Sequence, residues 1–202
     1  MTVMEISAAL VKKLRDVTGA GMMECKAALT EANGDLEAAT TLLRKRGLAH
    51  AAKKAGRSTS EGLVGHYIHM GGKIGVLVEV NCESDFVART EKFQELTKEL
   101  AMHIAAANPT YVRREDVPAG IVDRERDIYK DQVKDKPAQV IDKIVEGKLN
   151  SFYQQFCLMD QASVRDPNVT ITQLVQDAIR ILGENITVTR FVRMKVGEQS
   201  AQ

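Results

Sequence analysis

The sequence predicts an α+β protein in which a small helical module precedes a core made of a three-stranded antiparallel sheet packed with helices. Apolar residues recur at helical spacing through the first fifty positions, whereas the residues on both sides of Gly71-Gly72 alternate between apolar and polar as strands do. A further alternating run near the C-terminus supplies the third strand. We expect the helical module over residues 1–55, a linker over 56–61 and the core over 62–202.

Three short helices are expected in the helical module. The first is indicated by apolar residues at helical spacing: Ile6, Leu10, Leu14 and Val17. The run 18–21 holds two glycines and ends this helix. The second helix extends from about residue 22 to 32, where Asn33-Gly34 allows a left-handed backbone. Asp35 can cap a third helix, which we expect to end near Gly47.

The residues that follow the linker are typical of a β-hairpin. Its strands extend over 63–70 and 73–81, and Gly71-Gly72 suits a two-residue turn because glycine adopts the left-handed backbone that such turns need. In this register one mostly apolar face is made by two opposed rows, Ile74, Val76, Val78 and Val80 against His69, Tyr67, Gly65 and Leu63. This face predicts the side on which helices cover the sheet.

The rest of the core is predicted to be helical up to its last strand. One helix extends over 84–107, and another over 170–182 is ended by a glycine. The charged region 119–156 divides at Lys136-Pro137 into two helices that meet as an antiparallel pair or a bend. The third strand is indicated by alternating apolar residues: Ile186, Val188, Val192, Met194 and Val196.

Composition limits the class of protein. The chain of 202 residues holds 28 Lys+Arg against 27 Asp+Glu, so its net charge of +1 does not point to a polyanion as partner. A hydrophobic share of 44% is typical of globular chains and excludes a disordered one. The sequence contains no CxxC pair among its three cysteines, Cys25, Cys82 and Cys157. It therefore indicates neither a zinc site nor a disulfide framework. The chain lacks a leader-like start and any run of about 18 apolar residues, so we expect a cytoplasmic protein without a membrane partner.

Three local patterns invite a functional interpretation, and each has a plainer one. The basic run 44–57 could contact nucleic acid or an acidic protein surface, but it also suits a solvated helix end and has no aromatic platform beside it. His66 and His69 are an odd number of residues apart, which puts them on opposite faces of a strand and disfavours a shared metal. The glycines of the hairpin do not match a phosphate-binding loop. We therefore expect no metal, no cofactor and no catalytic set, and hence not an enzyme.

A polar segment over 81–85 joins the second strand to the following helix and is followed at once by Phe86. Ser84 or Asp85 can cap this helix. Phe86 precedes Phe93 by seven residues, so one continuous helix would place both rings on the same face. Periodicity alone therefore predicts that Phe86 lies in the core.

Four segments carry a resemblance to a known family: residues 14–29, 80–88, 144–149 and 190–198. In this order they resemble the elongation factor Ts family, and the resemblance covers nearly the whole chain. Ser84 stands where threonine is usual, which preserves a hydroxyl N-cap, and Glu24 stands where aspartate is common. The chain is similar to the short form of the family, which has one core unit and acts as a dimer, so a homodimer is implied.

The resemblance implies a guanine-nucleotide exchange factor for elongation factor Tu. On this interpretation Asp85 and Phe86, flanked by Ser84 and Val87, form a corner that inserts into the GTPase domain of the partner. The insertion disturbs the Mg²⁺ and phosphate contacts that retain GDP, so that GTP can rebind during polypeptide elongation. Resemblance therefore places Phe86 at the surface, against its periodicity.

The helical module resembles a ubiquitin-associated module that docks on the same GTPase domain. Lys12, Arg15, Met22 and Met23 match contact positions of the family, and His69 matches a position near the partner surface. The alternative for the two methionines is packing within their own bundle. Because adjacent helical residues point in different directions, we expect at least one to be exposed.

Two other function classes compete with the exchange factor. A non-catalytic binding module would use the helices and the basic run to engage polypeptide or nucleic acid, and its RNA binding would depend on salt. A small-molecule enzyme is disfavoured by the missing catalytic and cofactor motifs. The exchange-factor interpretation instead implies elongation factor Tu, GDP-bound and nucleotide-free, as partner, with no direct contact to nucleic acid.

Overall fold

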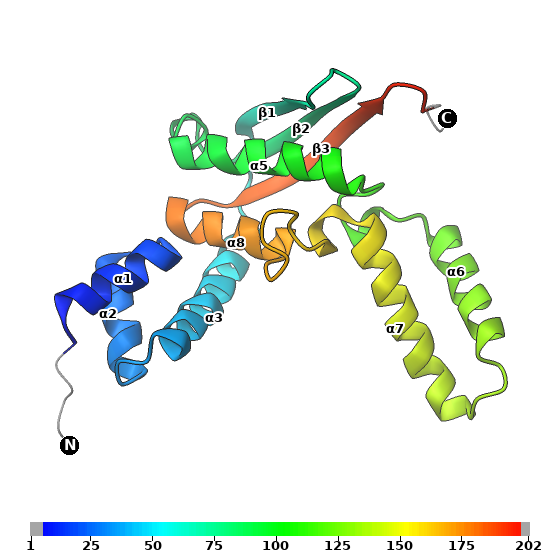
Figure 1. The fold of residues 1–202 in the computed structure, drawn as a ribbon, viewed down its shortest axis with the longest axis horizontal. Coiled ribbons are helices and arrows are strands. Elements are labelled where there is room, and N and C mark those ends of the chain that lie inside the picture. Colours follow the sequence, from blue (N-terminus) through cyan, green and yellow to red (C-terminus); the bar gives the residue numbers. More distant parts are fainter. Residues whose placement is uncertain (1–5, 199–202) are drawn as a thin grey trace. The chain divides into compact units, whose positions relative to one another are not determined.

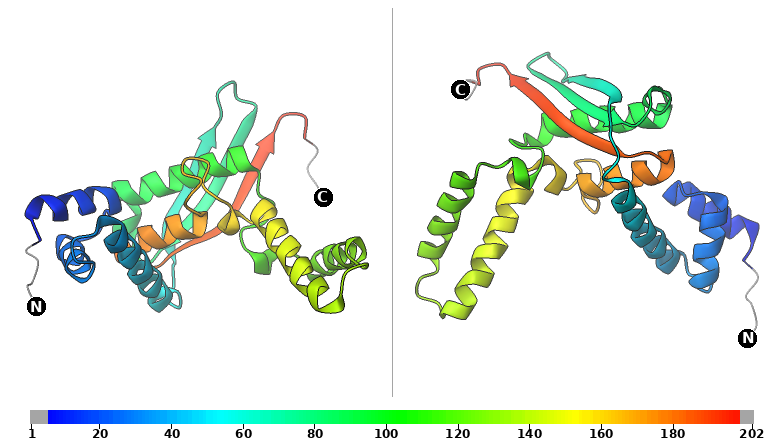
Figure 2. Two further views of the ribbon diagram at one scale, coloured as in Figure 1. Left: turned by 60° about the horizontal axis from the view of Figure 1, so that its bottom comes forward. Right: turned by 180° about the vertical axis from the view of Figure 1, so that it is seen from behind.

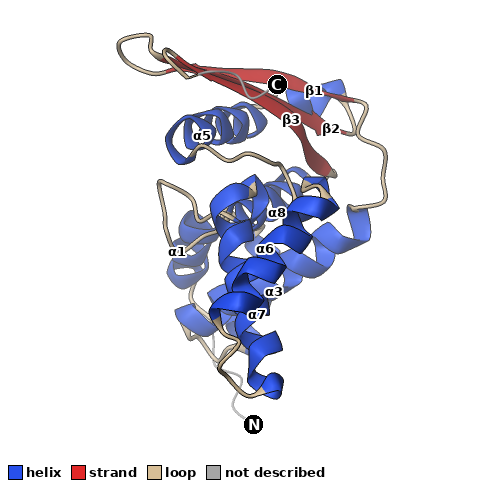
Figure 3. Cartoon of the chain, turned by 90° about the vertical axis from the view of Figure 1, so that its right-hand side faces the viewer, coloured by secondary structure: helices blue, strands red, loops and turns tan. Residues whose placement is uncertain are grey.

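The computed structural model describes residues 6–198 and confirms the α+β class. The three strands form one antiparallel sheet in the order β1-β2-β3, and the remaining elements are helical (Figure 3). In chain order the elements are α1 (Ala8–Thr18), α2 (Met22–Glu31), α3 (Leu36–Lys54), β1 (Glu61–Ile68), β2 (Ile74–Cys82), α4 (Asp85–Ala88), α5 (Glu91–Ala107), α6 (Ala119–Gln132), α7 (Ala138–Phe156), α8 (Ile171–Leu182) and β3 (Ile186–Lys195), with 3₁₀ turns at Arg114–Asp116 and Leu158–Asp160 (Figure 1).

The chain forms two compact units, each built from segments far apart in the sequence. The first comprises Met1–Leu63, Asn81–Leu96 and Gln173–Thr187, and the second comprises Val64–Val80, Thr97–Thr172 and Val188–Gln202. The helices of the N-terminal module therefore share a unit with α4 and most of α8. Whether residues 1–55 fold independently of a core over 62–202, across a linker at 56–61, stays a prediction.

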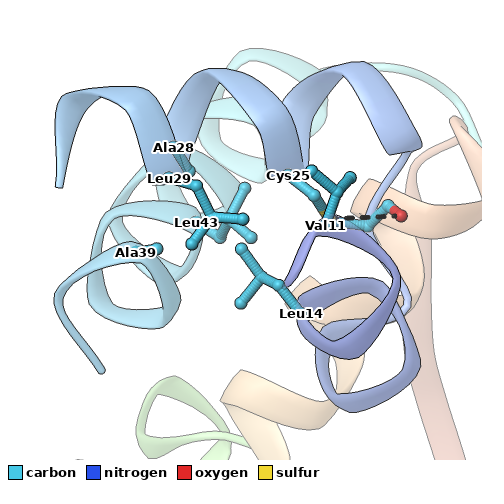
Figure 4. Packing of buried hydrophobic residues seen from close by; sticks show 8 residues of the cluster. Val11, Leu14, Cys25, Ala28, Leu29, Ala39 and Leu43 are labelled. Atoms are coloured by element: carbon cyan, nitrogen blue, oxygen red, sulfur yellow. Dashed lines mark hydrogen bonds between the residues drawn. The ribbon is translucent and has the colours of Figure 1, made fainter. Parts of the chain in front are cut away.

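The N-terminal helices pack around a small core of their own. Eight buried residues form it: Val11, Leu14, Ala20, Cys25, Ala28, Leu29, Ala39 and Leu43 (Figure 4). The expected cap is confirmed, because the Asp35 carboxylate accepts a hydrogen bond from the backbone N–H of Ala38 at 3.0 Å. The two-glycine break after α1 is also confirmed, with Gly19 in the left-handed region at φ 64°.

The predicted end of α3 near Gly47 is wrong, because the helix continues to Lys54. Gly47 serves packing instead: a Cβ atom there would lie 3.2 Å from Cδ of Arg180 in α8. The Arg180 guanidinium also donates a hydrogen bond to the carbonyl of Thr18 at 2.6 Å. Arg180 therefore ties α8 to both α1 and α3, and the missing side chain at residue 47 makes room for it.

The predicted hairpin register is confirmed, although the turn is longer than two residues. The backbone N–H of His69 donates to the carbonyl of Ile74 at 2.9 Å, as the expected pairing requires. The N–H of Gly72 donates to the carbonyl of His69, so the turn closes over 69–72 rather than around Gly71-Gly72 alone. Figure 2 shows this hairpin beside β3. Its inner face is buried at three valines of β2: Val76, Val78 and Val80.

The helical predictions for the second half of the core are confirmed, and β3 departs only in its burial. Pro137 precedes α7, and α6 and α7 form a pair joined by Arg126 and Glu146 at 3.2 Å. In β3, Ile186 and Val188 are buried, whereas the apolar residues nearer its end are exposed: Val192 and Met194, followed by Val196.

Candidate partner-binding corner

The corner that joins β2 to α4 presents two exposed side chains on a buried base. The Ser84 hydroxyl caps α4 by accepting from the backbone N–H of Val87 at 3.4 Å. The Phe86 side chain is 76% exposed, whereas Val87 is 6% exposed and packs inward. The Asp85 carboxylate is exposed and pairs with the guanidinium of Arg89, one turn later, at 2.6 Å. We name residues 82–87 the corner.

The structure overturns the periodicity prediction for Phe86 because the expected continuous helix is broken. α4 ends at Ala88, and a new helix, α5, begins at Glu91. Thr90 makes the break: its hydroxyl donates to the carbonyl of Val87 at 2.7 Å and accepts from the backbone N–H of Phe93 at 3.3 Å. Because the helical phase restarts at Thr90, Phe86 no longer shares a face with Phe93, which is fully buried.

Two glutamates hold the corner in a reciprocal exchange of hydrogen bonds. Glu184, in the loop between α8 and β3, accepts through Oε2 from the backbone N–H groups of Glu83 at 3.1 Å and Ser84 at 3.0 Å. Its Oε1 accepts from the Ser84 hydroxyl at 2.6 Å. In return, Glu83 accepts from the backbone N–H of Asn185 at 2.6 Å. We name this pair of carboxylates the clasp.

The surroundings of the clasp favour the charged form of Glu83 and disfavour the thiolate form of the neighbouring Cys82. The backbone hydrogen bond from Asn185, helped by Arg57, lowers the pKa of Glu83. Burial, and then the charge of Glu184, raise the pKa of Cys82, whose thiol donates to the carbonyl of Ser84 at 3.1 Å. Cys82 is therefore a structural thiol of the corner rather than an activated nucleophile.

The other predicted contact residues lie at exposed positions. In the module, Lys12, Arg15 and the two methionines of α2 are exposed, and Met23 is exposed at 76%. We expected at least one of the two methionines to be exposed, and the structure shows that both point away from the small core. His69 lies exposed at the end of the hairpin, where its Nδ1 is 3.1 Å from the hydroxyl of Tyr67.

Half of the basic side chains in the run 44–57 contact other residues of the chain. Arg46 pairs with Glu31, and Arg57 pairs with Glu83 of the clasp at 3.4 Å. Lys54 is 8% exposed and donates to the carbonyl of Gly183. For these three residues the structure therefore favours a structural role over a nucleic-acid surface.

Within residues 6–198, no group of three or more histidine, cysteine or carboxylate residues is arranged to hold a metal ion. In the same stretch, the helices are too short or too polar to cross a membrane. The cysteines are buried free thiols, and burial raises the pKa of Cys157 to about 11. The exposed ring of Phe86 makes the corner a candidate protein-binding site.

Comparison with known proteins decides the family. A family model described as elongation factor TS matches residues 6–198. The chain belongs to the elongation factor Ts family. Curated relatives of that name include one from Fervidobacterium nodosum, 62% identical over 96% of this chain and all of the relative, and one from Geobacter sulfurreducens, 57% identical over 96% and 91%. A third, from Thermosipho melanesiensis, is 57% identical over 96% of this chain and all of the relative.

Sequence reasoning about this elongation factor Ts chain missed the residues that support its corner. Glu184 and Asn185 follow Gly183 in a short polar loop, and polar residues there are expected for any turn between a helix and a strand. They lie about 100 residues from the corner in the sequence, so no local spacing connects them. Only the fold, which brings the start of β3 to the end of β2, identifies them.

Proposed function

We propose that the protein promotes release of GDP from elongation factor Tu by inserting the corner, with Phe86 leading, into the GTPase domain of that partner. Membership of the elongation factor Ts family supports the role of nucleotide exchange factor for elongation factor Tu. The observation that carries the mechanism is the exposed Phe86 ring on a base held by the clasp. Insertion disturbs the Mg²⁺ and phosphate contacts of bound GDP, so GTP can enter afterwards.

The energetics of such a wedge are reasonable. A phenylalanine side chain gains about 1.5–3 kcal/mol when it moves from water into an apolar pocket. Phe86 is 76% exposed in the free protein, so most of that gain is still available for binding. By linkage, a factor that weakens GDP binding is itself bound less tightly when GDP is present. The protein therefore accelerates exchange in both directions and changes no covalent bond.

The residues next to Phe86 have different roles in this proposal. Asp85 is exposed and reaches the partner beside Phe86, whereas the Ser84 hydroxyl and the buried Val87 set the backbone from which both project. In this proposal Ser84 and Val87 act from within the corner.

A second contact comes from the helical module, which resembles a ubiquitin-associated domain. Lys12 and Arg15 of α1 and Met22 and Met23 of α2 are exposed and form this contact. Exposed methionines suit a protein interface because their flexible side chains adapt to the partner surface. His69 adds a weaker contact at the hairpin. The module thus supplies affinity for elongation factor Tu, and the corner distorts the nucleotide site of that partner.

The uncovered face of the sheet supports a homodimer. Arg193 donates to the carbonyl of Ala105 in α5, so its strand neighbours Val192 and Met194 point to the opposite face. The exposed apolar residues of the sheet, between 53% and 72% exposed, are Val64, Ile68, Leu77, Val192 and Met194. Single-domain monomers rarely expose so many neighbouring apolar residues, and a second copy of the cytoplasmic protein covers them.

The proposed function is tested by loading elongation factor Tu with labelled GDP and following its release into excess unlabelled nucleotide. We expect the protein to accelerate release in a saturable manner. The variant Ile128→Ala, which truncates an exposed apolar residue of α6, is a control and should accelerate release equally. If release proceeds at the spontaneous rate, or if the protein binds RNA but not elongation factor Tu, the proposal is wrong.

A further inference from the structure

The clasp points to a residue that the exchange reaction needs but that does not itself meet the partner. We infer that Glu184 is a positioning residue for nucleotide exchange, acting through the corner. The inference rests on the proposed function, because it explains how Phe86 is held for insertion. Its basis is the set of three hydrogen bonds that one carboxylate accepts from Glu83 and Ser84, directly before Asp85 and Phe86.

The corner needs outside support because α4 is too short to hold itself. The helix has four residues, and an isolated helical turn is unstable in water since few hydrogen bonds offset the ordering of its backbone. At its N-terminus the side-chain cap is the 3.4 Å contact from Val87 to Ser84. The Glu184 carboxylate fixes the backbone immediately before this turn with shorter, charge-assisted bonds.

The loop that carries Glu184 is itself anchored on both sides. Lys54 at the end of α3 donates to the carbonyl of Gly183, directly before Glu184. Directly after it, the Asn185 side chain donates to the carbonyl of Arg57 at 2.9 Å, and its backbone N–H donates to Glu83. The carboxylate thus projects from a loop held at its two neighbours, so it transmits the rigidity of the surrounding fold to the corner.

If Glu184 positions the corner, its loss should change the rate of GDP release more than the affinity for the partner. A wedge that distorts a nucleotide site does its work only in the strained complex, so loss of rigidity should slow the limiting step more than it weakens binding. Affinity rests mainly on the exposed residues of the module. A residue that only stabilised the fold would instead leave the limiting rate of the folded molecules unchanged.

The test measures the GDP release rate against factor concentration for Glu184→Ala and Glu184→Gln. We expect Glu184→Ala to lower the limiting rate about tenfold, because small misplacements of an acting group are costly, while the half-saturating concentration changes less than about twofold. The Gln variant keeps an oxygen for the two backbone N–H groups and an amide that can donate to the Ser84 hydroxyl, so it should recover most of the rate. If the Ala variant fails to fold, Glu184→Gln and Ser84→Ala carry the test, and each should show a smaller loss of the same kind.

Two comparisons make the outcome decisive. In a Phe86→Ala background, Glu184→Ala should cause no further loss of limiting rate, since both changes disable one corner. Asp160→Ala removes a carboxylate that pairs with Arg114 at 2.5 Å elsewhere in the chain, and should keep the wild-type rate. An unchanged limiting rate in Glu184→Ala, or additive losses in the double variant, overturns the inference alone. If Phe86→Ala also releases GDP as fast as wild type, the proposed wedge itself fails.

Discussion

Gly65 in β1 faces Thr97 in α5 so closely that a Cβ atom at residue 65 would lie 2.3 Å from Cγ2 of Thr97. The same atom would lie 3.3 Å from the carbonyl oxygen of Thr97, and Thr97 is buried, so neither group can move aside freely. The close approach of α5 to the sheet therefore depends on the absence of a side chain in β1.

Gly65→Ala should lower the free energy of unfolding by about 1–3 kcal/mol, the usual cost of forcing an extra carbon into a packed core. Urea denaturation measures this difference. Gly120→Ala is the matched control, because a Cβ atom there meets nothing within 4 Å, and it should be neutral or slightly stabilising. Equal stability of the two variants would contradict the packing described for Gly65.

The buried ring of His103 should make the folded protein less stable in mild acid. The ring is fully buried in α5, donates from Nε2 to Gln161 at 2.8 Å and accepts at Nδ1 from the backbone N–H of Val164. Burial lowers its pKa below the ordinary value of 6.5, against a smaller opposing effect of Gln161. The unfolded chain therefore takes up a proton more readily, and the stability present above pH 6.5 declines as the pH falls below it.

The measurement for His103 is the free energy of unfolding of wild type and His103→Gln at pH 7.5 and 5.5. Wild type should lose about 1 kcal/mol more than the variant over this interval, because one proton is bound differently by the two states. His50→Gln, at an exposed histidine of α3, should keep the wild-type dependence. Parallel curves for wild type and His103→Gln would exclude His103 as the cause.

Leu77→Lys tests the proposed dimer face. Leu77 lies in the central strand on the uncovered side of the sheet, so a lysine there places a charge in the middle of any interface formed by that face. Sedimentation equilibrium should find a dimer for wild type and a monomer for the variant, whereas Ile128→Lys on α6 should remain dimeric. A wild-type monomer, or a dimer in Leu77→Lys, would rule out this interface.

Local chemistry predicted much of this fold. The glycines after Met70 allowed the hairpin register to be predicted even though the turn is longer, because the loop absorbs the difference without shifting the strands. Phe86 shows where periodicity stops being reliable. One threonine at residue 90 restarts the helical phase, and a hydroxyl is too common a signal to predict such a break by itself.

The residues that support the corner could not be predicted from the sequence, for a different reason. Glu184 and Glu83 are joined by tertiary contacts, and neither residue differs from an ordinary solvated glutamate in its local context. The same holds for Arg180, whose hydrogen-bond partner Thr18 lies in another helix. Such long-range polar contacts depend on the assembled fold, whereas the exposed corner itself was predicted by family resemblance.

The most direct test of the wedge is the limiting rate of labelled GDP release from elongation factor Tu at saturating Phe86→Ala. We predict a rate about 30-fold below that of the wild-type protein, the effect of losing about 2 kcal/mol at a central interface residue. The melting temperature should stay unchanged, because the ring is exposed in the free protein. A wild-type release rate, or a rate loss explained by a large fall in melting temperature, would contradict the account.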